Sequence, residues 1–308
     1  MITNTQPVIL LAGPTASGKT ALAVRLARAL DGEIINADSM QIYADLDILS
    51  ARPNTAEQGG VPHHLFGVMD GAERASVGWW AKVTIERIAE IRARGHRPII
   101  VGGTGLYFNA LVKGLAAMPE ITPRTRQSVE AIAAQGLDAL REQAMACDPV
   151  ATARIKPADQ QRLMRVVEIG FETGLPITTF QSDTIPLLEE SDWTGIVIEL
   201  DRQSLYQRIE QRFDAMMTNG ALEEVEVLSL RQLNRNLPAM KALGVPPLLE
   251  VIAGNAELAT AIAQSKQETR RYAKRQMTWF RNQLADWQRV TSVDGEVSDE
   301  ELICRLRA

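Results

Sequence analysis

The sequence is poor in cysteine and histidine, and it has no long apolar run. Its 308 residues include two cysteines, Cys147 and Cys304, and three histidines. Two cysteines this far apart match no metal or redox spacing, so we expect reduced thiols, as in cytosolic proteins. No apolar stretch approaches the roughly 20 residues that cross a bilayer, and the first residues lack the basic segment of a secretory signal. We therefore expect a cytoplasmic protein with no membrane partner and no evident obligate protein partner.

The sequence also lacks an excess of positive charge. Its net charge is −5, with 33 Lys and Arg against 38 Asp and Glu, so a nucleic acid would have to bind a local basic surface. The composition, 45% hydrophobic and 23% charged, is typical of a soluble globular protein with one large domain or two moderate ones. Lys266 to Arg281 contains six basic residues and one acid, Glu268. This stretch is either a polyanion-binding surface or a solvated helix face.

A phosphate-binding motif lies close to the N-terminus. Residues 13–20 read GPTASGKT, between the apolar run Val8–Ala12 and a segment of helical periodicity. This is the strand–loop–helix setting that the G-x-x-x-x-G-K-[ST] phosphate loop requires. Amide groups of such a loop surround a phosphate, and the helix adds its positive end. Lys19 supplies a charge for the outer phosphate, and the Thr20 hydroxyl is a natural Mg²⁺ ligand.

The pattern of strands and helices predicts an α/β fold. Apolar runs at 8–12, 33–37, 98–101 and 195–200 predict strands, with a shorter one near 289–293. Helical patterns occupy 77–94, 204–219, 222–230, 256–287 and 299–307, and a turn region is expected over 237–247. Strands that alternate with helices predict a parallel sheet covered on both faces, a P-loop NTPase-like core. Ligands of such sheets bind at the carboxyl ends of the strands.

An all-helical segment interrupts this core. From residue 117 onward, prolines break the chain, and short amphipathic helices are expected at 126–132, 137–146 and 160–172. No convincing strand follows until the run at 195–200. We therefore predict a core of residues 1–116 and 196–308 with a helical insertion domain, 117–195.

Polar residues follow two of the predicted strands, at the edge where the phosphate loop lies. Asp38 follows the second strand, where a carboxylate can accept a proton from a nucleophile or cap a helix. The strand at 98–101 ends in Gly102-Gly103-Thr104, not in the Asp that nucleotide hydrolysis normally uses for magnesium. Asp201, after the insertion, is a weak substitute. This absence argues against an ATPase or GTPase and is compatible with a flat substrate close to the backbone.

Two further pairs of side chains, one of histidines and one of arginines, are candidates for ligand contact. His63 and His64 are adjacent and lack a metal-ligand spacing, so structural or substrate-contact roles are favoured over a metal site. Arg208 and Arg212 are one helical turn apart and could reach a diphosphate if their helix points at the edge of the sheet.

The residues alone leave the function open. One possibility is a small-molecule kinase, in which the loop holds ATP and Asp38 activates a hydroxyl. Another is a non-catalytic RNA-binding module, which would leave the complete phosphate loop unexplained. A third is implied by a resemblance to a known family.

Several segments together resemble the tRNA dimethylallyltransferases. They include GPTASGKTALA (13–23), INADSMQIYADLDILSARP (35–53), VGGTGLY (101–107), DQQRLMRVVEI (159–169) and AKRQMTWFR (273–281), which appear in family order over nearly the whole chain. The resemblance implies transfer of a dimethylallyl group from dimethylallyl diphosphate to N6 of adenosine 37. The acceptor would be tRNA that reads codons beginning with U, held by its anticodon stem-loop.

The resemblance also implies roles for particular residues. The diphosphate would be bound by Gly13, Pro14, Thr15, Ala16, Ser17, Gly18, Lys19 and Thr20, with Mg²⁺ on Thr20. The catalytic residues would be Asp38, Thr104, Lys19 and Arg208, with Asp38 accepting a proton from N6. Contacts to tRNA are implied for Asp38, Ser39, Met40, Gln41, Thr104, Arg126, Gln161, Arg162, Leu163, Met164, Arg165 and Lys241.

Overall fold

The core is a six-stranded sheet in which every strand pairing is parallel. A computed structural model describes residues 6–181, 184–291 and 300–307. The strand order is β3-β2-β4-β1-β5-β6. The strands are β1 (Val8–Ala12), β2 (Gly32–Asn36), β3 (His63–His64), β4 (Arg97–Gly102), β5 (Trp193–Glu199) and β6 (Gln288–Thr291). β1 lies at the centre, paired with β4 on one side and β5 on the other.

These strands confirm the predicted parallel sheet and refine its limits. β5 begins at Trp193, inside the range expected for the insertion, because Trp193 and Thr194 already pair with Val8 and Ile9. The two-residue strand β3 was not predicted, since a pair of histidines carries no apolar signal. The predicted strand near 289–293 is present as β6, and residues 292 and 293 lie outside the described residues.

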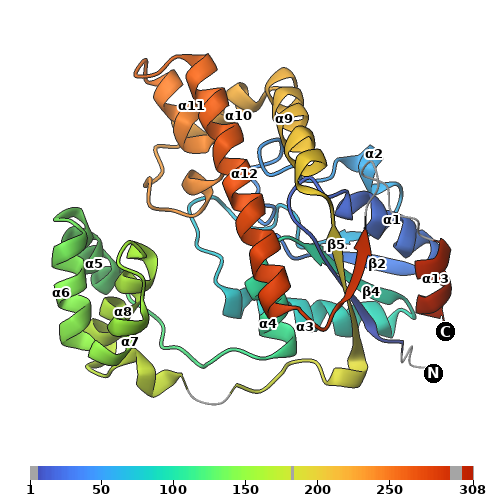
Figure 1. The fold of residues 1–308 in the computed structure, drawn as a ribbon, viewed down its shortest axis with the longest axis horizontal. Coiled ribbons are helices and arrows are strands. Elements are labelled where there is room, and N and C mark those ends of the chain that lie inside the picture. Colours follow the sequence, from blue (N-terminus) through green and yellow to red (C-terminus); the bar gives the residue numbers. More distant parts are fainter. Residues whose placement is uncertain (1–5, 182–183, 292–299, 308) are drawn as a thin grey trace. The chain divides into compact units, whose positions relative to one another are not determined.

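Helices cover both faces of the sheet (Figure 1). Every residue of β1, β2 and β4 is buried, which requires cover on both sides. Alternate strand residues such as Ile9, Leu11 and Ile99 pack with Leu22 and Leu26 in one core cluster. The flanking helices are α1 (Lys19–Leu30), α3 (Val77–Ala93), α4 (Gly105–Val112) and α13 (Glu300–Arg307), and the short helix α2 (Thr55–Gln58), which buries no residue, precedes β3. The closing helix was expected from Asp299, which lies outside the described residues.

A second group of helices follows β5 and packs together beside the sheet (Figure 1). It comprises α9 (Arg202–Thr218), α10 (Ala221–Leu230), the 3-10 turn η3 (Ala239–Lys241), α11 (Val245–Ile252) and α12 (Leu258–Gln283). Helix α11 was not predicted, because Pro246 and Pro247 read as a turn. They occupy its first turn, where a proline costs no hydrogen bond. None of the described helices combines the length and apolar character needed to span a membrane.

Residues 113–186 form a separate helical unit, against the 117–195 expected. It contains α5 (Pro123–Ala134), α6 (Leu137–Cys147), α7 (Pro149–Arg154), α8 (Gln160–Thr173) and η1 (Ile177–Phe180), while the turn η2 (Glu190–Asp192) belongs to the core. The unit has its own apolar core, to which Val129, Leu140, Leu163 and Val167 contribute. Asp148 is buried there and accepts hydrogen bonds from Ala151 N and from Thr178. These are the features of an independently packed domain.

Candidate active site

The phosphate loop connects β1 to α1 at the carboxyl edge of the sheet. Ala16 (φ 63°) and Gly18 (φ 82°) both adopt left-handed backbone angles, and these two residues turn the chain back onto itself. The first turn of α1 has amide groups with no intrahelical acceptor, as at any helix start. The Ser17 hydroxyl is buried and has no hydrogen-bond partner among the described residues. The loop is therefore shaped as an anion-binding site.

Two arginines of α9 reach the phosphate loop. Arg208 Nε donates to the Ala16 carbonyl oxygen at 3.0 Å, and Arg212 donates to Thr15 Oγ1. Both arginines were expected here only if α9 pointed at the edge of the sheet, and it does. The resemblance implies a catalytic role only for Arg208, whereas the structure shows that Arg212 also bonds to the loop.

Positive charge is concentrated at the loop beyond what one carboxylate balances. Burial lowers the pKa of Lys19 to about 8; the Asp38 charge opposes this shift and Arg212 adds to it. Burial also lowers the pKa of Arg212 to about 10, again opposed by Asp38 and reinforced by Arg208. Cations that depress one another's pKa values are stabilised by an incoming anion. The site therefore favours a ligand with more than one negative charge.

Asp38 lies next to this cationic group, at the end of β2. Its Oδ1 accepts from Met40 N at 3.0 Å, and its own N donates to Asn36 Oδ1 at 2.8 Å. Thr104 Oγ1 accepts from Ser39 N at 3.0 Å, so the ends of β2 and β4 meet. The structure thus brings together Asp38, Ser39 and Thr104, three residues named by the sequence. Asp201, the weak alternative acid, instead caps α9 by accepting from the amides of Gln203 and Ser204.

Helix α12 supplies two side chains that sequence reasoning had not assigned to the site. Gln276 is buried, with Oε1 accepting from Thr15 N at 2.9 Å and Nε2 donating to the Gly103 carbonyl oxygen at 2.9 Å. It therefore links the phosphate loop to the end of β4. Any side chain at Gly103 would meet Gln276 Nε2 at 2.3 Å, which explains the glycine. The Tyr272 hydroxyl bonds with Thr104 and Gln276, and burial raises its pKa.

A cavity of about 260 Å³ opens beside these groups. Its polar lining includes Asp38, Ser39, Arg212, Lys241, Tyr272 and Arg275. Its apolar lining is formed by Met40, Leu49, Ile209, Phe213, Met216 and Leu243. A pocket with a carboxylate, several cationic side chains and an apolar wall suits a ligand that carries phosphate at one end and hydrocarbon at the other.

Gln41 does not line this cavity. Its amide nitrogen donates to the carbonyl oxygens of Ser50 (3.0 Å) and Ala51 (2.8 Å), and the side chain is buried. Gln41 thus holds together residues 38–52, called the 38–52 loop from here on. Gln41 is one of the residues named for tRNA contact, and both of its amide N–H donors are directed into the protein.

The remaining residues named for RNA contact lie in the helical unit, which is described by itself. Gln161 and Arg162 are exposed on α8, while Arg126 on α5, Met164 and Arg165 are half-buried. Arg162 and Arg165 pair with Asp159 (3.4 Å) and Glu168 (3.3 Å). Leu163 is fully buried in the core of the unit. Its side chain therefore packs inside the unit, whereas those of Gln161 and Arg162 lie at the surface.

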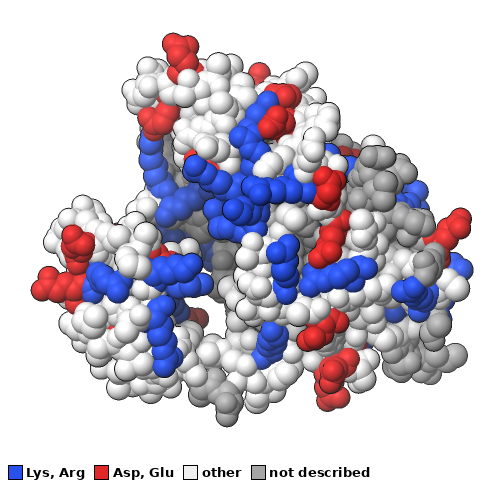
Figure 2. Space-filling model, viewed as in Figure 1, with Lys and Arg blue, Asp and Glu red and all other residues white. Residues whose placement is uncertain are grey.

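The basic stretch of α12 is partly neutralised by α9. Lys266 pairs with Asp214 at 2.6 Å, and Arg270 pairs with Glu210. Arg271, Lys274 and Arg275 remain exposed, and Arg275 lies over the Tyr272 ring at 5.8 Å. Figure 2 shows Lys and Arg gathered over the part of the surface that α12 forms in Figure 1. The basic residues of α12 thus form two sets: Lys266 and Arg270 pair with α9, and Arg271, Lys274 and Arg275 form the exposed set.

The adjacent histidines have structural partners. His64 Nε2 lies 2.6 Å from Glu33 Oε2, and His63 Nδ1 donates to the Val61 carbonyl oxygen at 2.8 Å. No group of three or more potential metal-ligating side chains is found over the described part of the chain. The structural interpretation of the pair is the one that the contacts support.

Comparisons with known proteins show the family of the chain. The family model described as "IPP transferase" matches residues 41–283, and the model "Isopentenyl transferase" matches residues 6–64. The chain belongs to the IPP transferase family. Relatives in this family named tRNA dimethylallyltransferase include one from Maricaulis maris, 54% identical over 95% of each chain. Another, from a Caulobacter species, is 48% identical over 93% of each chain.

Solved IPP transferase structures share the fold. The tRNA isopentenylpyrophosphate transferase of Bacillus halodurans superposes with a TM-score of 0.71 at 33% identity, covering 98% of this chain and 95% of that one. A eukaryotic dimethylallyltransferase described as acting on tRNA gives a TM-score of 0.79 at 28% identity, covering 97% of this chain and 77% of that one. The core therefore has the P-loop NTPase-like fold of this family.

Proposed function

We propose that the protein transfers a dimethylallyl group from dimethylallyl diphosphate to N6 of adenosine 37 in tRNAs that read codons beginning with U. The products are N6-(dimethylallyl)adenosine and diphosphate. The observation that carries the proposal is the pairing of one carboxylate, Asp38, with the cation cluster of Lys19, Arg208 and Arg212 beside a partly apolar cavity. The names of the relatives and their tRNA-bound neighbour support the same conclusion.

The negative charge and the proton that the reaction releases each have a complementary group in the site. The lone pair of N6 attacks the allylic carbon, and the carbon–oxygen bond breaks with its electrons passing to the diphosphate. Lys19, Arg208, Arg212 and the loop amides stabilise the negative charge that grows on this leaving group. Asp38 accepts the proton that N6 loses. Thr104, which orients Ser39, lies beside Asp38 and positions the acceptor.

The residues present fit a magnesium ion at the phosphate loop. Thr20 lies in the first turn of α1, and the Ser17 hydroxyl is buried without a hydrogen-bond partner in the described part of the chain. Mg²⁺ keeps most of its water and takes few protein ligands beside phosphates, so one hydroxyl suffices. When bound, the ion would neutralise charge on the departing diphosphate.

The exposed cations provide the surface for tRNA. Lys241 at the cavity, the exposed set on α12, and Arg126, Gln161, Arg162, Met164 and Arg165 of the helical unit would contact the anticodon stem-loop. A single-stranded loop is the part of an RNA whose bases can be extruded into a pocket. The enzyme would act as a monomer in the cytoplasm.

Mass spectrometry of the product tests the proposal. Unmodified tRNA with adenosines at positions 36 to 38 is incubated with the protein, dimethylallyl diphosphate and Mg²⁺, then digested to nucleosides. Appearance of one dimethylallyl group on adenosine 37 is expected. A tRNA that stays unmodified at every Mg²⁺ concentration would contradict the proposal.

A further inference from the structure

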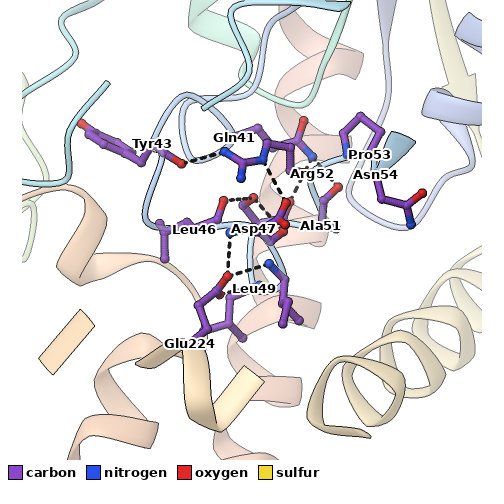
Figure 3. Close-up of polar contacts among 12 residues, drawn as sticks. Gln41, Tyr43, Leu46, Asp47, Leu49, Ala51, Arg52, Pro53, Asn54 and Glu224 are labelled. Atoms are coloured by element: carbon purple, nitrogen blue, oxygen red, sulfur yellow. Dashed lines mark hydrogen bonds and ion pairs between the residues drawn. The ribbon is translucent and has the colours of Figure 1, made fainter. Parts of the chain in front are cut away.

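The 38–52 loop is held from outside by a carboxylate of α10. Glu224 Oε1 accepts from Asp47 N at 2.6 Å and from Ile48 N at 2.7 Å, and Glu224 Oε2 accepts from Leu49 N at 2.9 Å (Figure 3). Three consecutive amides thus converge on one side chain that is 175 or more residues away in the chain. Consecutive N–H groups directed at one point form a nest for an anion. In this protein the anion is an internal carboxylate.

Backbone amides and the start of a helix surround the Glu224 carboxylate. Hydrogen bonds to a carboxylate are shorter and stronger than those to a neutral acceptor. Glu224 lies in the first turn of α10, where the helix dipole stabilises negative charge. The neighbouring arginines have other partners: Arg52 pairs with Asp47, and Arg231 pairs with Asp45 and Asp70. Amides are therefore the main partners of Glu224.

The part of the 38–52 loop that Glu224 holds forms one wall of the cavity. Leu49 and Ser50 line it together with Asp38, Ser39 and Met40 at the start of the same loop. Gln41, within the loop, donates hydrogen bonds to the carbonyl oxygens of Ser50 and Ala51. Glu224, on another helix, accepts hydrogen bonds from the amides of residues 47–49. One loop thus carries both the proposed base, Asp38, and the cavity wall formed by Leu49 and Ser50. The conformation of this loop sets the position of Asp38 relative to that wall.

In the proposed reaction this wall would contact the acceptor adenosine and not the diphosphate donor. The diphosphate is fixed at the phosphate loop by Lys19, Arg208 and Arg212. The proton acceptor Asp38 begins the 38–52 loop, so the adenine that loses its proton must lie against this loop. We propose that Glu224 is a positioning residue for the acceptor nucleoside, acting through the amides of residues 47–49. The inference rests on the proposed function and adds to it a residue that touches neither substrate.

The test compares Glu224→Gln with Glu223→Gln. Glutamine keeps the size of Glu224 but replaces one acceptor oxygen with an NH₂ group that faces backbone N–H donors. Glu223 is exposed on the same helix and makes no hydrogen bond to the 38–52 loop among the described residues, so its variant is the matched control. Both variants and the wild type are measured for kcat, for the KM of each substrate and for melting temperature.

A split between the two substrates is expected. For Glu224→Gln the KM for tRNA should rise about tenfold, the scale of losing hydrogen bonds to a charged group, while the KM for dimethylallyl diphosphate changes less than about twofold. Hydrogen exchange at the amides of residues 47–49 should accelerate in this variant only. Glu223→Gln should match the wild type in every respect.

The outcomes separate this inference from the proposed function. An active wild type with an unchanged tRNA KM in Glu224→Gln would overturn the inference and leave the function standing. Equal losses in both KM values together with a lowered melting temperature would show a purely structural role, which also overturns it. A wild type that never prenylates tRNA would refute the function, while the exchange measurement would still report on the contact itself.

Discussion

The phosphate loop and the 38–52 loop both follow parallel strands at one edge of the sheet, yet they are held in shape differently. The backbone turn of the first is set by two left-handed residues and a helix start within eight residues, and side chains of α9 and α12 then bond to it. The second is irregular and depends on Gln41 from within and Glu224 from another helix. Both loops have long-range contacts, but only the phosphate loop has a local backbone geometry that a short motif encodes.

Removing the Asp38 carboxylate should have the largest effect. Asp38→Ala is expected to lower kcat about a hundredfold or more, because it deletes the proton acceptor, while diphosphate binding stays near normal. Rapid-quench turnover and equilibrium binding measure the two quantities. Asp38→Asn is the matched variant, because its amide oxygen can still accept from Met40 N.

The pair of variants distinguishes chemistry from loop shape. Equal losses in Asp38→Ala and Asp38→Asn would establish the carboxylate as the base. Activity retained by Asp38→Asn alone would mean that the residue serves only to cap the loop, and the assigned role would be wrong.

Gln276 joins the two regions indirectly, so its loss should affect both substrates. Gln276→Glu removes the donor to the Gly103 carbonyl and buries a charge, and we expect kcat/KM to fall about tenfold for both substrates. Gln267→Glu, exposed on the same helix, is the control. A loss confined to one substrate would show that Gln276 supports only one of the two loops.

The pH dependence of donor binding should show the smallest effect. With a pKa of about 8, Lys19 loses its proton between pH 7.5 and 8.5, and the KM for dimethylallyl diphosphate should rise about threefold over this range. The folded pKa lies below the ordinary value of 10.5, so the unfolded chain holds the proton longer and Lys19 makes stability rise from about pH 8 to 10.5.

Lys19→Met provides the control for both effects. It should bind the donor weakly and without this pH dependence, and its melting temperature should lack the rise. A wild-type KM that stays constant across pH 7.5–8.5 would contradict the assignment of a titrating lysine to the diphosphate.

The same contrast explains how much the sequence could predict. The phosphate loop, the main strands and the position of Asp38 follow from motifs of a few residues. Gln276 and Glu224 carry no such signal, because a buried Gln or a first-turn Glu reads as an ordinary helix residue. Their roles arise from hydrogen-bond partners that lie 173 and 177 residues away in the chain.

Two residues named for RNA contact have side chains directed into the protein, for physical reasons. Leu163 lies at helical spacing with Val166 and Val167, a pattern that indicates a core position, and it is buried. Gln41 is polar but satisfies buried carbonyls, and sequence alone does not show whether a polar side chain faces inward.

The central claim is that the phosphate loop holds a leaving group, so the carbon moves and the phosphorus does not. Phosphorus NMR of the complete reaction with dimethylallyl diphosphate, tRNA and Mg²⁺ tests this most directly. All consumed donor should appear as free diphosphate, in a one-to-one ratio with N6-(dimethylallyl)adenosine in the tRNA. Release of inorganic phosphate, or phosphorus attached to the acceptor as in a kinase, would contradict the account.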